Sequence, residues 1–133
     1  MILSHHAYFL TGDTQQALDF LDKNLDIEKQ ANPDYIFQRM DALSIDDARN
    51  IKLVHSKKPF GEKRIFIIQT ESISLESQNA LLKVFEEPEP NNHFFIIIEN
   101  PQLLPTLKSR VQIIHFEKEN KGAEEISLRL REK

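Results

Sequence analysis

The chain has 133 residues, of which 40% are hydrophobic and 29% are charged, enough for one domain with a buried core but not for two of ordinary size. Its 17 basic and 21 acidic residues give a net charge of -4 at pH 7, which argues against the clustered basic excess of a free-standing nucleic-acid binder. There is no cysteine, so disulfides, thiolate zinc sites and cysteine nucleophiles are excluded, and we expect a protein of the reducing cytoplasm.

Short apolar runs alternate along the chain with longer amphipathic segments, a pattern typical of an α/β domain with a mainly parallel sheet. In chain order we expect strands at residues 7–10, 35–37, 64–68, 93–98 and 111–116. Helices are expected between them, over residues 14–25, 45–55 and 75–87, with a short helical or extended passage at 101–105 and a final helix at 123–131. Because parallel crossovers are right-handed, these elements predict a doubly wound, three-layer sandwich.

Three of the expected helices carry a start signal. Asp13 precedes the first helix, and Gln16 stands three positions later to complete a capping box. Ser44 and Asp47 form the same pattern before the second helix, and Ser74 caps the third.

The apolar stripes of these helices are expected to face the sheet. Their members are Ala17, Phe20, Leu21 and Leu25 on the first helix, Ile45, Ala48 and Ile51 on the second, and Leu75, Leu82 and Phe85 on the third. The longest apolar run of the chain, residues 94–98, is too short to span a membrane, and the amino end has no secretory pattern. We therefore expect neither export by this route nor a membrane partner.

The turn after the first strand is where a sheet of this kind would bind phosphate. A phosphate cradle needs several glycines, so that consecutive backbone amides can face one anion, together with a lysine and a hydroxyl. Residues 11–16 read Thr-Gly-Asp-Thr-Gln-Gln, with one glycine, no lysine and a carboxylate where the anion would lie. We therefore expect no bound nucleotide, no other cofactor and no nucleotide hydrolysis by this chain alone.

Two groups of polar residues could hold a metal but have plainer explanations. Asp41, Asp46 and Asp47 could bind magnesium in a nuclease or phosphatase, yet acids at a helix start are typical solvated partners of the helix dipole. His5 and His6 could be ligands, yet neighbours on an extended strand point opposite ways. We expect no metal site, and a metal-dependent enzyme built on the aspartates stays a distant alternative.

The densest basic group of the chain consists of Lys57, Lys58, Lys63 and Arg64, which flank Phe60. As a nucleic-acid patch this group is thin, because few cations are present and the chain as a whole is acidic. We expect a solubilising polar turn at the foot of the third strand.

Two motifs resemble the clamp-loader branch of the AAA+ family. They are Asn-Ala-Leu-Leu-Lys-Val-Phe-Glu-Glu-Pro at residues 79–88 and Leu-Leu-Pro-Thr-Leu-Lys-Ser-Arg at residues 103–110. Residues 6–10 look like the family's first strand, residues 44–51 like its Ser-Ile helix and residues 64–68 like its Walker B strand. Members of the delta-prime type are most similar, with the gamma/tau type close behind. The resemblance implies a degenerate P-loop NTPase or AAA+ core, a three-layer sandwich with a five-stranded, mainly parallel sheet.

In this family a five-membered ring, part of DNA polymerase III, opens a sliding clamp and closes it on primed DNA. A neighbouring subunit inserts the arginine of a Ser-Arg-Cys motif at the ATP phosphates. That arginine maps to Arg110, preceded by Ser109, with Val111 in place of the cysteine. The resemblance implies that Arg110 acts in trans on the transferred phosphoryl group; the plainer alternative is a surface arginine paired with a carboxylate. Ser109 has neither an evident base nor a nucleophile-elbow setting, so we do not expect it to be a nucleophile.

The chain also departs from the family pattern. Ile68 and Gln69 stand where the Walker B aspartate and glutamate would be, and these side chains can neither hold magnesium nor act as a base. The segment before the Ser-Ile helix is short and free of cysteine, whereas family members often carry a zinc module there. Residues 1–118 are expected to form the degenerate domain, and residues 119–133 a terminal helix leading toward an absent lid domain. The chain is then either an excised domain or a naturally reduced protein.

The resemblance therefore implies a non-hydrolysing clamp-loader subunit that assists clamp loading and donates Arg110 to a neighbouring ATPase. Its implied partners are gamma/tau-like ATPases and a delta-like subunit, with the sliding clamp and primed DNA reached indirectly. The alternative is a stand-alone protein-binding module that derives from a clamp loader and does not join the ring.

Overall fold

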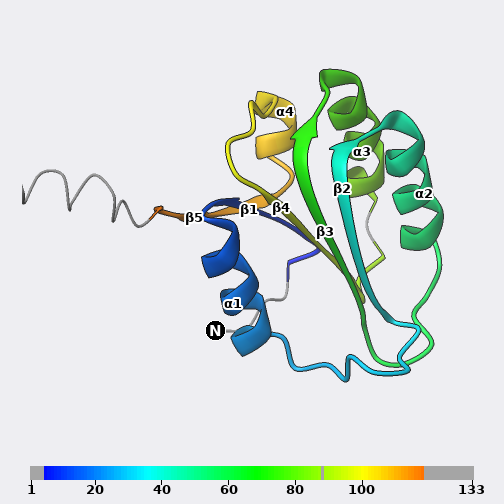
Figure 1. Cartoon of the computed structure of the whole chain (residues 1–133). Helices are drawn as coiled ribbons and strands as arrows, with labels where there is room; N and C mark the ends of the chain where they lie inside the picture. Colours follow the sequence, from blue (N-terminus) through cyan, green and yellow to red (C-terminus); the bar gives the residue numbers. More distant parts are fainter. Residues whose placement is uncertain (1–4, 88, 119–133) are drawn as a thin grey trace, which may run out of the picture.

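Strands and helices alternate throughout the part of the chain that the computed structural model describes, residues 5–87 and 89–118 (Figure 1). In chain order the elements are β1 (Ala7–Gly12), α1 (Thr14–Asn24), β2 (Tyr35–Leu43), α2 (Ile45–His55), β3 (Arg64–Ile73), α3 (Leu75–Glu86), β4 (Asn92–Ile98), α4 (Pro105–Lys108) and β5 (Gln112–Phe116). The alternation is the one that the sequence predicts. The final helix expected at residues 123–131 lies outside the described residues.

The strands form one five-stranded sheet in the order β2-β3-β4-β1-β5, and every neighbouring pair is parallel. β4 lies at the centre and all seven of its residues are buried, because its apolar run meets cover on both faces. On β1, Phe9 lies opposite Ile96 of β4 and Ile113 of β5. The predicted parallel sheet is therefore confirmed.

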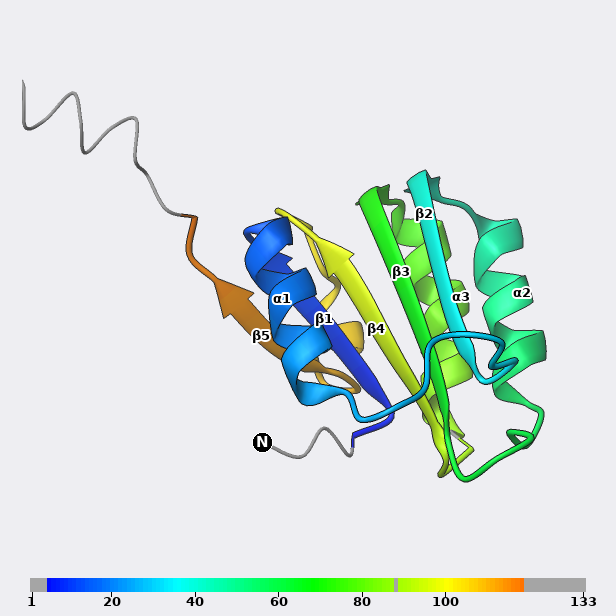
Figure 2. The same cartoon turned by 60° about the horizontal axis from the view of Figure 1, so that its bottom comes forward.

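Helices cover both faces of the sheet, so the molecule has three layers (Figures 1 and 2). One core, which includes Phe9, Phe85 and Phe94, lies between the sheet and α2, α3 and α4. The other core lies on the opposite face under α1 and includes Leu10 and Phe95. Successive strand residues enter opposite cores, as the pleat requires. Within the described residues α1 is alone on its face, and β2 lies beyond it at the sheet edge (Figure 2).

The cap of α2 forms as predicted, and the cap of α1 forms in part. The Ser44 hydroxyl accepts a hydrogen bond from the Asp47 amide, and the Asp47 carboxylate accepts one from the Ser44 amide. At α1 the Asp13 carboxylate accepts from the Gln16 amide at 2.9 Å. The reciprocal bond, from the Asp13 amide to the Gln16 side chain, is absent because the Asp13 amide donates to the Phe116 carbonyl at 2.9 Å. The Gln16 side-chain amide donates to the Glu117 carbonyl at 2.8 Å.

The sequence misplaces two features of the periphery. Leu75, expected in the buried stripe of α3, is 57% exposed because it is the first residue of the helix. Phe85 is buried as expected and Leu82 is partly buried, and Ser77 and Leu81 are buried as well. β2 reaches Leu43 instead of ending at Phe37, since the middle of an edge strand is exposed and lacks an apolar run. None of the helices described is long and apolar enough to cross a membrane.

Candidate functional site

The turn between β1 and α1, where a phosphate cradle would lie, is closed by backbone hydrogen bonds. The Gly12 amide donates to the Glu99 carbonyl at 2.8 Å, and the Asp13 amide donates to the Phe116 carbonyl at 2.9 Å. Gly12 has a φ of 88°, and a Cβ atom added there would lie 1.8 Å from the Phe116 oxygen. Two amides that a phosphate would need are therefore engaged by the ends of β4 and β5.

The positive end of the α1 dipole is also occupied. The Asp13 carboxylate accepts from the Gln16 amide, so a negative group of the chain itself sits where an anion would bind. A second anion at this point would meet the charge of Asp13. The turn is thus closed both by hydrogen bonding and by electrostatics.

Next to this turn, a polar cleft of about 680 Å³ opens at the carboxyl edge of the sheet. Gln69 lines it, whereas Ile68 is 1% exposed and belongs to the core. The cleft carries three carboxylates, Asp41, Glu71 and Glu99, and one guanidinium, that of Arg39. This excess of negative charge does not favour a triphosphate.

The structure does not gather the aspartates into a metal site. The Asp47 carboxylate accepts from the amide and the hydroxyl of Ser44, and the Asp46 carboxylate lies 3.5 Å from the Arg49 guanidinium. Within residues 5–87 and 89–118, no group of three or more histidine, cysteine, aspartate and glutamate side chains is placed to hold a metal ion. The dipole and capping interpretation of these acids is the one that the contacts support.

The two adjacent histidines do not point apart as the sequence analysis expects. They precede β1 in a bend, and the ring centroids of His5 and His6 lie 4.1 Å apart. The geometric reason given against a shared ligand was therefore wrong, because an extended backbone was assumed. Burial lowers the pKa of the His6 imidazole, the neighbouring His5 lowers it further, and the Arg110 backbone has a smaller opposite effect.

Ser109 and Arg110 lie at the end of α4, immediately before β5. The Ser109 hydroxyl donates to the Thr106 carbonyl at 2.7 Å and accepts from Nη1 of Arg110 at 3.1 Å. Arg110 is exposed and forms no ion pair in the part of the chain that the structure describes. The alternative of a surface arginine paired with a carboxylate therefore has no partner among these residues.

Arg110 directly precedes the amino-terminal end of β5, whereas the closed turn lies at the carboxyl ends of β1 and β5. β5 runs parallel to β1, with Gln112 opposite Tyr8 and Phe116 opposite Gly12. At about 3.3 Å per strand residue, the length of β5 separates Arg110 from the turn of its own chain by about 17 Å. The arginine therefore cannot serve that turn, and its side chain is exposed.

Arg64, expected on a basic surface, is buried instead. It is 5% exposed, its guanidinium donates to the carbonyls of Val54, Lys57 and Lys58, and its Nε lies 3.8 Å from the Asp34 carboxylate. The basic group at residues 57–64 therefore loses one of its members, and the contacts support a structured turn. The sequence analysis missed Asp34, because no local pattern pairs residues thirty positions apart.

Comparison with known proteins finds a matching family model and similar sequences. Residues 22–120 match the family model described as "DNA polymerase III, delta subunit". The chain is 33% identical over 96 residues to the DNA polymerase III subunit delta' of Bacillus subtilis, covering 68% of this chain and 29% of the relative. It is 35% identical over 85 residues to that of Buchnera aphidicola, covering 59% and 26%. The chain thus spans about a quarter of the length of these curated relatives.

Two solved structures share the fold. A DNA polymerase III gamma subunit-related protein of Thermotoga maritima superposes with a TM-score of 0.58 at 19% identity, covering 91% of this chain and 44% of that protein. The Bacillus subtilis DNA clamp loader delta protein also gives a TM-score of 0.58, at 17% identity, covering 95% and 42%. At such identities the likeness establishes the fold alone.

Proposed function

The chain belongs to the DNA polymerase III delta subunit family, as a delta-prime-like, clamp-loader-related domain, and from this premise we propose that it serves as a non-hydrolysing clamp-loader subunit. In this role Arg110 is donated to the ATPase site of a neighbouring subunit. The observation that carries the proposal is that Arg110 is exposed and forms no ion pair with a carboxylate among the described residues. It also lies at the opposite end of β5 from the closed turn of its own chain.

The closed turn supports the non-hydrolysing half of the proposal. Phosphoryl transfer requires amides and cations that cradle the phosphates, and a base or water-positioning group beside them. Here the Gly12 and Asp13 amides are engaged, and Ile68 and Gln69 supply neither a magnesium ligand nor a base. Any hydrolysis that depends on this chain must therefore occur at a site on another subunit.

Arg110 has the chemistry that such a site needs. Its guanidinium stays charged and presents several donors in a fixed plane, so it can stabilise the negative charge that develops on a transferred phosphoryl group. Ser109 acts as a positioning residue: with its own proton directed to the Thr106 carbonyl, the hydroxyl oxygen accepts from Nη1 of Arg110. This contact limits the orientations of the guanidinium before a partner arrives.

The partners proposed on this basis are gamma/tau-like ATPases and a delta-like subunit, and the setting is cytoplasmic DNA replication. The sliding clamp and primed DNA would be reached through the assembled subunits. The other hypothesis, a stand-alone binding module that stays outside the ring, predicts that this chain neither joins the ATPases nor changes their turnover.

The proposal is tested by reconstituting the loader with its clamp, primed DNA and a gamma/tau-like ATPase, with or without this chain. Arg110→Ala should abolish turnover at the one site that receives the arginine, because such a residue is worth about 10³–10⁵ in rate. Arg110→Lys should restore little, since lysine lacks the planar fork. Lys108→Ala, which removes an exposed cation from α4, is the matched control and should leave turnover unchanged.

Two outcomes separate the hypotheses. If Arg110→Ala joins the assembly and turnover is unaltered, the donor role is wrong. If the wild-type chain does not co-purify with the ATPases at all, the stand-alone hypothesis takes its place. Ser109→Ala should give an intermediate loss of turnover, which the hydroxyl of Ser109→Thr should recover.

A further inference from the structure

A buried glutamine of α3 holds the segment that leads into α4. Gln78 is 0% exposed, and its side-chain amide donates to the Gln102 carbonyl at 2.8 Å. Its side-chain oxygen accepts from the Leu104 amide, also at 2.8 Å. Because a backbone carbonyl can only accept and a backbone amide can only donate, these two partners fix which way the glutamine side chain is turned. One side chain of α3 therefore binds the segment at two points.

The amino end of α4 depends on this glutamine. The helix has four residues, and the side chain of its N-cap residue, Leu104, makes no capping hydrogen bond. A helix of this length is not stable by itself. Leu107 is 0% exposed and packs in the core beneath α4, but apolar contacts are non-directional and set the orientation of a single turn only loosely. The two hydrogen bonds of Gln78 supply the directional contacts.

A series of hydrogen bonds connects Gln78 with Arg110. The Leu104 amide is bonded to Gln78, and the Leu104 carbonyl accepts from the Lys108 amide at 3.0 Å, which closes the turn of α4. The next residue, Ser109, accepts from Nη1 of Arg110. Leu104 is therefore bonded to α3 through its N–H and to the end of α4 through its C=O. A displacement of Leu104 would move the residues that carry the guanidinium.

We propose that Gln78 is a positioning residue for Arg110, because it holds the start of the short helix that ends at this arginine. The proposal rests on the donor role proposed above for Arg110. Gln78 acts through α4 and is not itself a catalytic residue. Since the placement of Arg110 can be measured in the full chain without an ATPase, the proposal can be tested separately from that donor role.

Gln78→Leu removes both hydrogen bonds with little change in side-chain size. Leucine can fill the same buried space, so we expect α3 to stay packed against the sheet. The Gln102 carbonyl and the Leu104 amide lose their partner, and an unpaired polar group is unfavourable unless it reaches water. Gln102 is already exposed, so the segment can move outward to solvate both groups. The variant should therefore release the start of α4 and leave the rest of the fold in place.

NMR on the ¹⁵N-enriched chain measures this release. In Gln78→Leu the amide order parameters of Leu104, Ser109 and Arg110 should fall below the roughly 0.85 of rigid backbone, and their chemical shifts should change. The signals of α1 and α2 should stay as in the wild type, which also shows that the variant is folded. Wild-type shifts and order parameters at Ser109 and Arg110 would overturn the proposal.

Gln78→Glu makes the same contact dependent on pH. A protonated carboxyl has one O–H donor and a free acceptor, so it can bind the Gln102 carbonyl and the Leu104 amide as glutamine does. The ionised carboxylate has no donor for that carbonyl, and burial raises the pKa of such a carboxyl. The Arg110 signals of this variant should match the wild type at low pH and approach those of Gln78→Leu as the pH rises. Arg110 signals that do not follow this titration would contradict the proposal.

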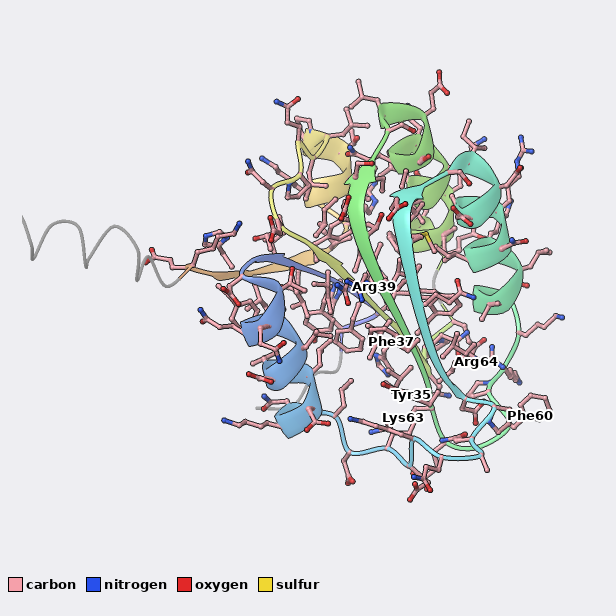
Figure 3. The ribbon with its side chains drawn as sticks, viewed as in Figure 1. Tyr35, Phe37, Arg39, Phe60, Lys63 and Arg64 are labelled. Carbon is pink, nitrogen blue, oxygen red and sulfur yellow. The ribbon has the colours of Figure 1, made fainter. Side chains whose placement is uncertain are left out.

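A second buried polar contact, far from α4, supplies a matched control. The Asp34 carboxylate accepts hydrogen bonds from the amides of Phe60, at 2.9 Å, and Gly61, at 2.6 Å, and lies beside Arg64. Figure 3 shows Arg64 far from α4. Asp34→Asn should therefore lower the free energy of unfolding without changing the Arg110 signals. If the glutamine had a merely structural role, the two variants would behave alike at the same loss of stability.

Turnover in the reconstituted loader completes the test. Gln78→Leu should join the assembly and lower turnover at the receiving site by about 10–100-fold, since a misplacement of about 1 Å can cost about 10²-fold. Asp34→Asn should leave turnover unchanged. If Arg110→Ala abolishes turnover but Gln78→Leu does not lower it, the positioning role is wrong. If Arg110→Ala leaves turnover unaltered, the donor role is wrong, and the NMR signals alone then decide whether Gln78 places the arginine.

Discussion

Removing Asp34 tests how strongly the fold depends on the buried ion pair beneath the α2–β3 loop. Asp34 is 4% exposed and Arg64 is 5% exposed, so Asp34→Ala leaves a guanidinium buried without its counter-ion. An uncompensated buried charge of this kind typically costs about 3–5 kcal/mol. The three carbonyl acceptors of Arg64 remain, and the amides of Phe60 and Gly61 can turn to water, so we do not add a further cost for them.

A loss of this size is a large fraction of the stability of a domain, which is about 5–15 kcal/mol. For a chain of this length it corresponds to a fall in Tm of about 10–20 °C. Urea unfolding followed by circular dichroism measures it directly, provided that the slope of the transition is the same in the variant and the wild type.

A double-mutant cycle shows whether the charge is the cause. Asp34→Ala with Arg64→Met removes both charges, and we expect the double variant to be more stable than Asp34→Ala alone, since no ion then remains buried. Asp34→Asn keeps the acceptor oxygen without the charge and should lie between the wild type and Asp34→Ala. The reasoning is refuted if Asp34→Ala costs less than about 1 kcal/mol. It is also refuted if the stability lost in the double variant equals the sum of the losses measured for Asp34→Ala and Arg64→Met alone.

Three further predictions concern other parts of the fold. Gly12→Ala should cost more than about 2 kcal/mol in urea unfolding, because a positive φ is unfavourable for alanine and its Cβ would collide with the Phe116 carbonyl; a smaller cost would mean that the turn opens easily. Ser44→Ala should cost about 0.5–2 kcal/mol by the same assay, through loss of the α2 capping box, and Ser44→Asp should recover most of it. Burial lowers the pKa of His6, so the unfolded chain binds its proton more readily, and Tm should fall as the pH drops below about 6.5. His6→Gln should make that fall shallower; an identical pH profile would contradict this assignment.

The elements that local signals encode could be predicted from the sequence. β4 follows from an apolar run that needs cover on both faces, and α2 follows from Ser44 and Asp47, whose capping box needs only a spacing of three. The closed phosphate turn was half predictable. The shortage of glycine and lysine indicates that no cradle can form, but the hydrogen bonds that close the turn come from Glu99 and Phe116, far along the chain.

The features that the sequence could not supply depend on contacts between distant residues. Asp34 lies in the turn before β2 and Arg64 is the first residue of β3, and a charged residue next to a polar stretch is normally solvated, so burial of this pair has no local sign. Arg64 was for this reason assigned to a surface. The side-chain amide of Gln16 likewise binds the Glu117 carbonyl, a partner that exists only once β5 lies beside β1.

One strand links the closed turn to the arginine that the chain presents. The far end of β5 closes the turn, through the Phe116 carbonyl, and its near end follows directly on Arg110. Adding glycines and a lysine to residues 11–16 would therefore not restore a phosphate site, because the Asp13 amide is released only if the end of β5 moves away. Any such movement would act on the strand that fixes Arg110. We therefore expect that substitutions made to reopen the turn also alter the position of Arg110. The hydrogen bond that closes the turn helps to fix β5, and β5 in turn fixes Arg110.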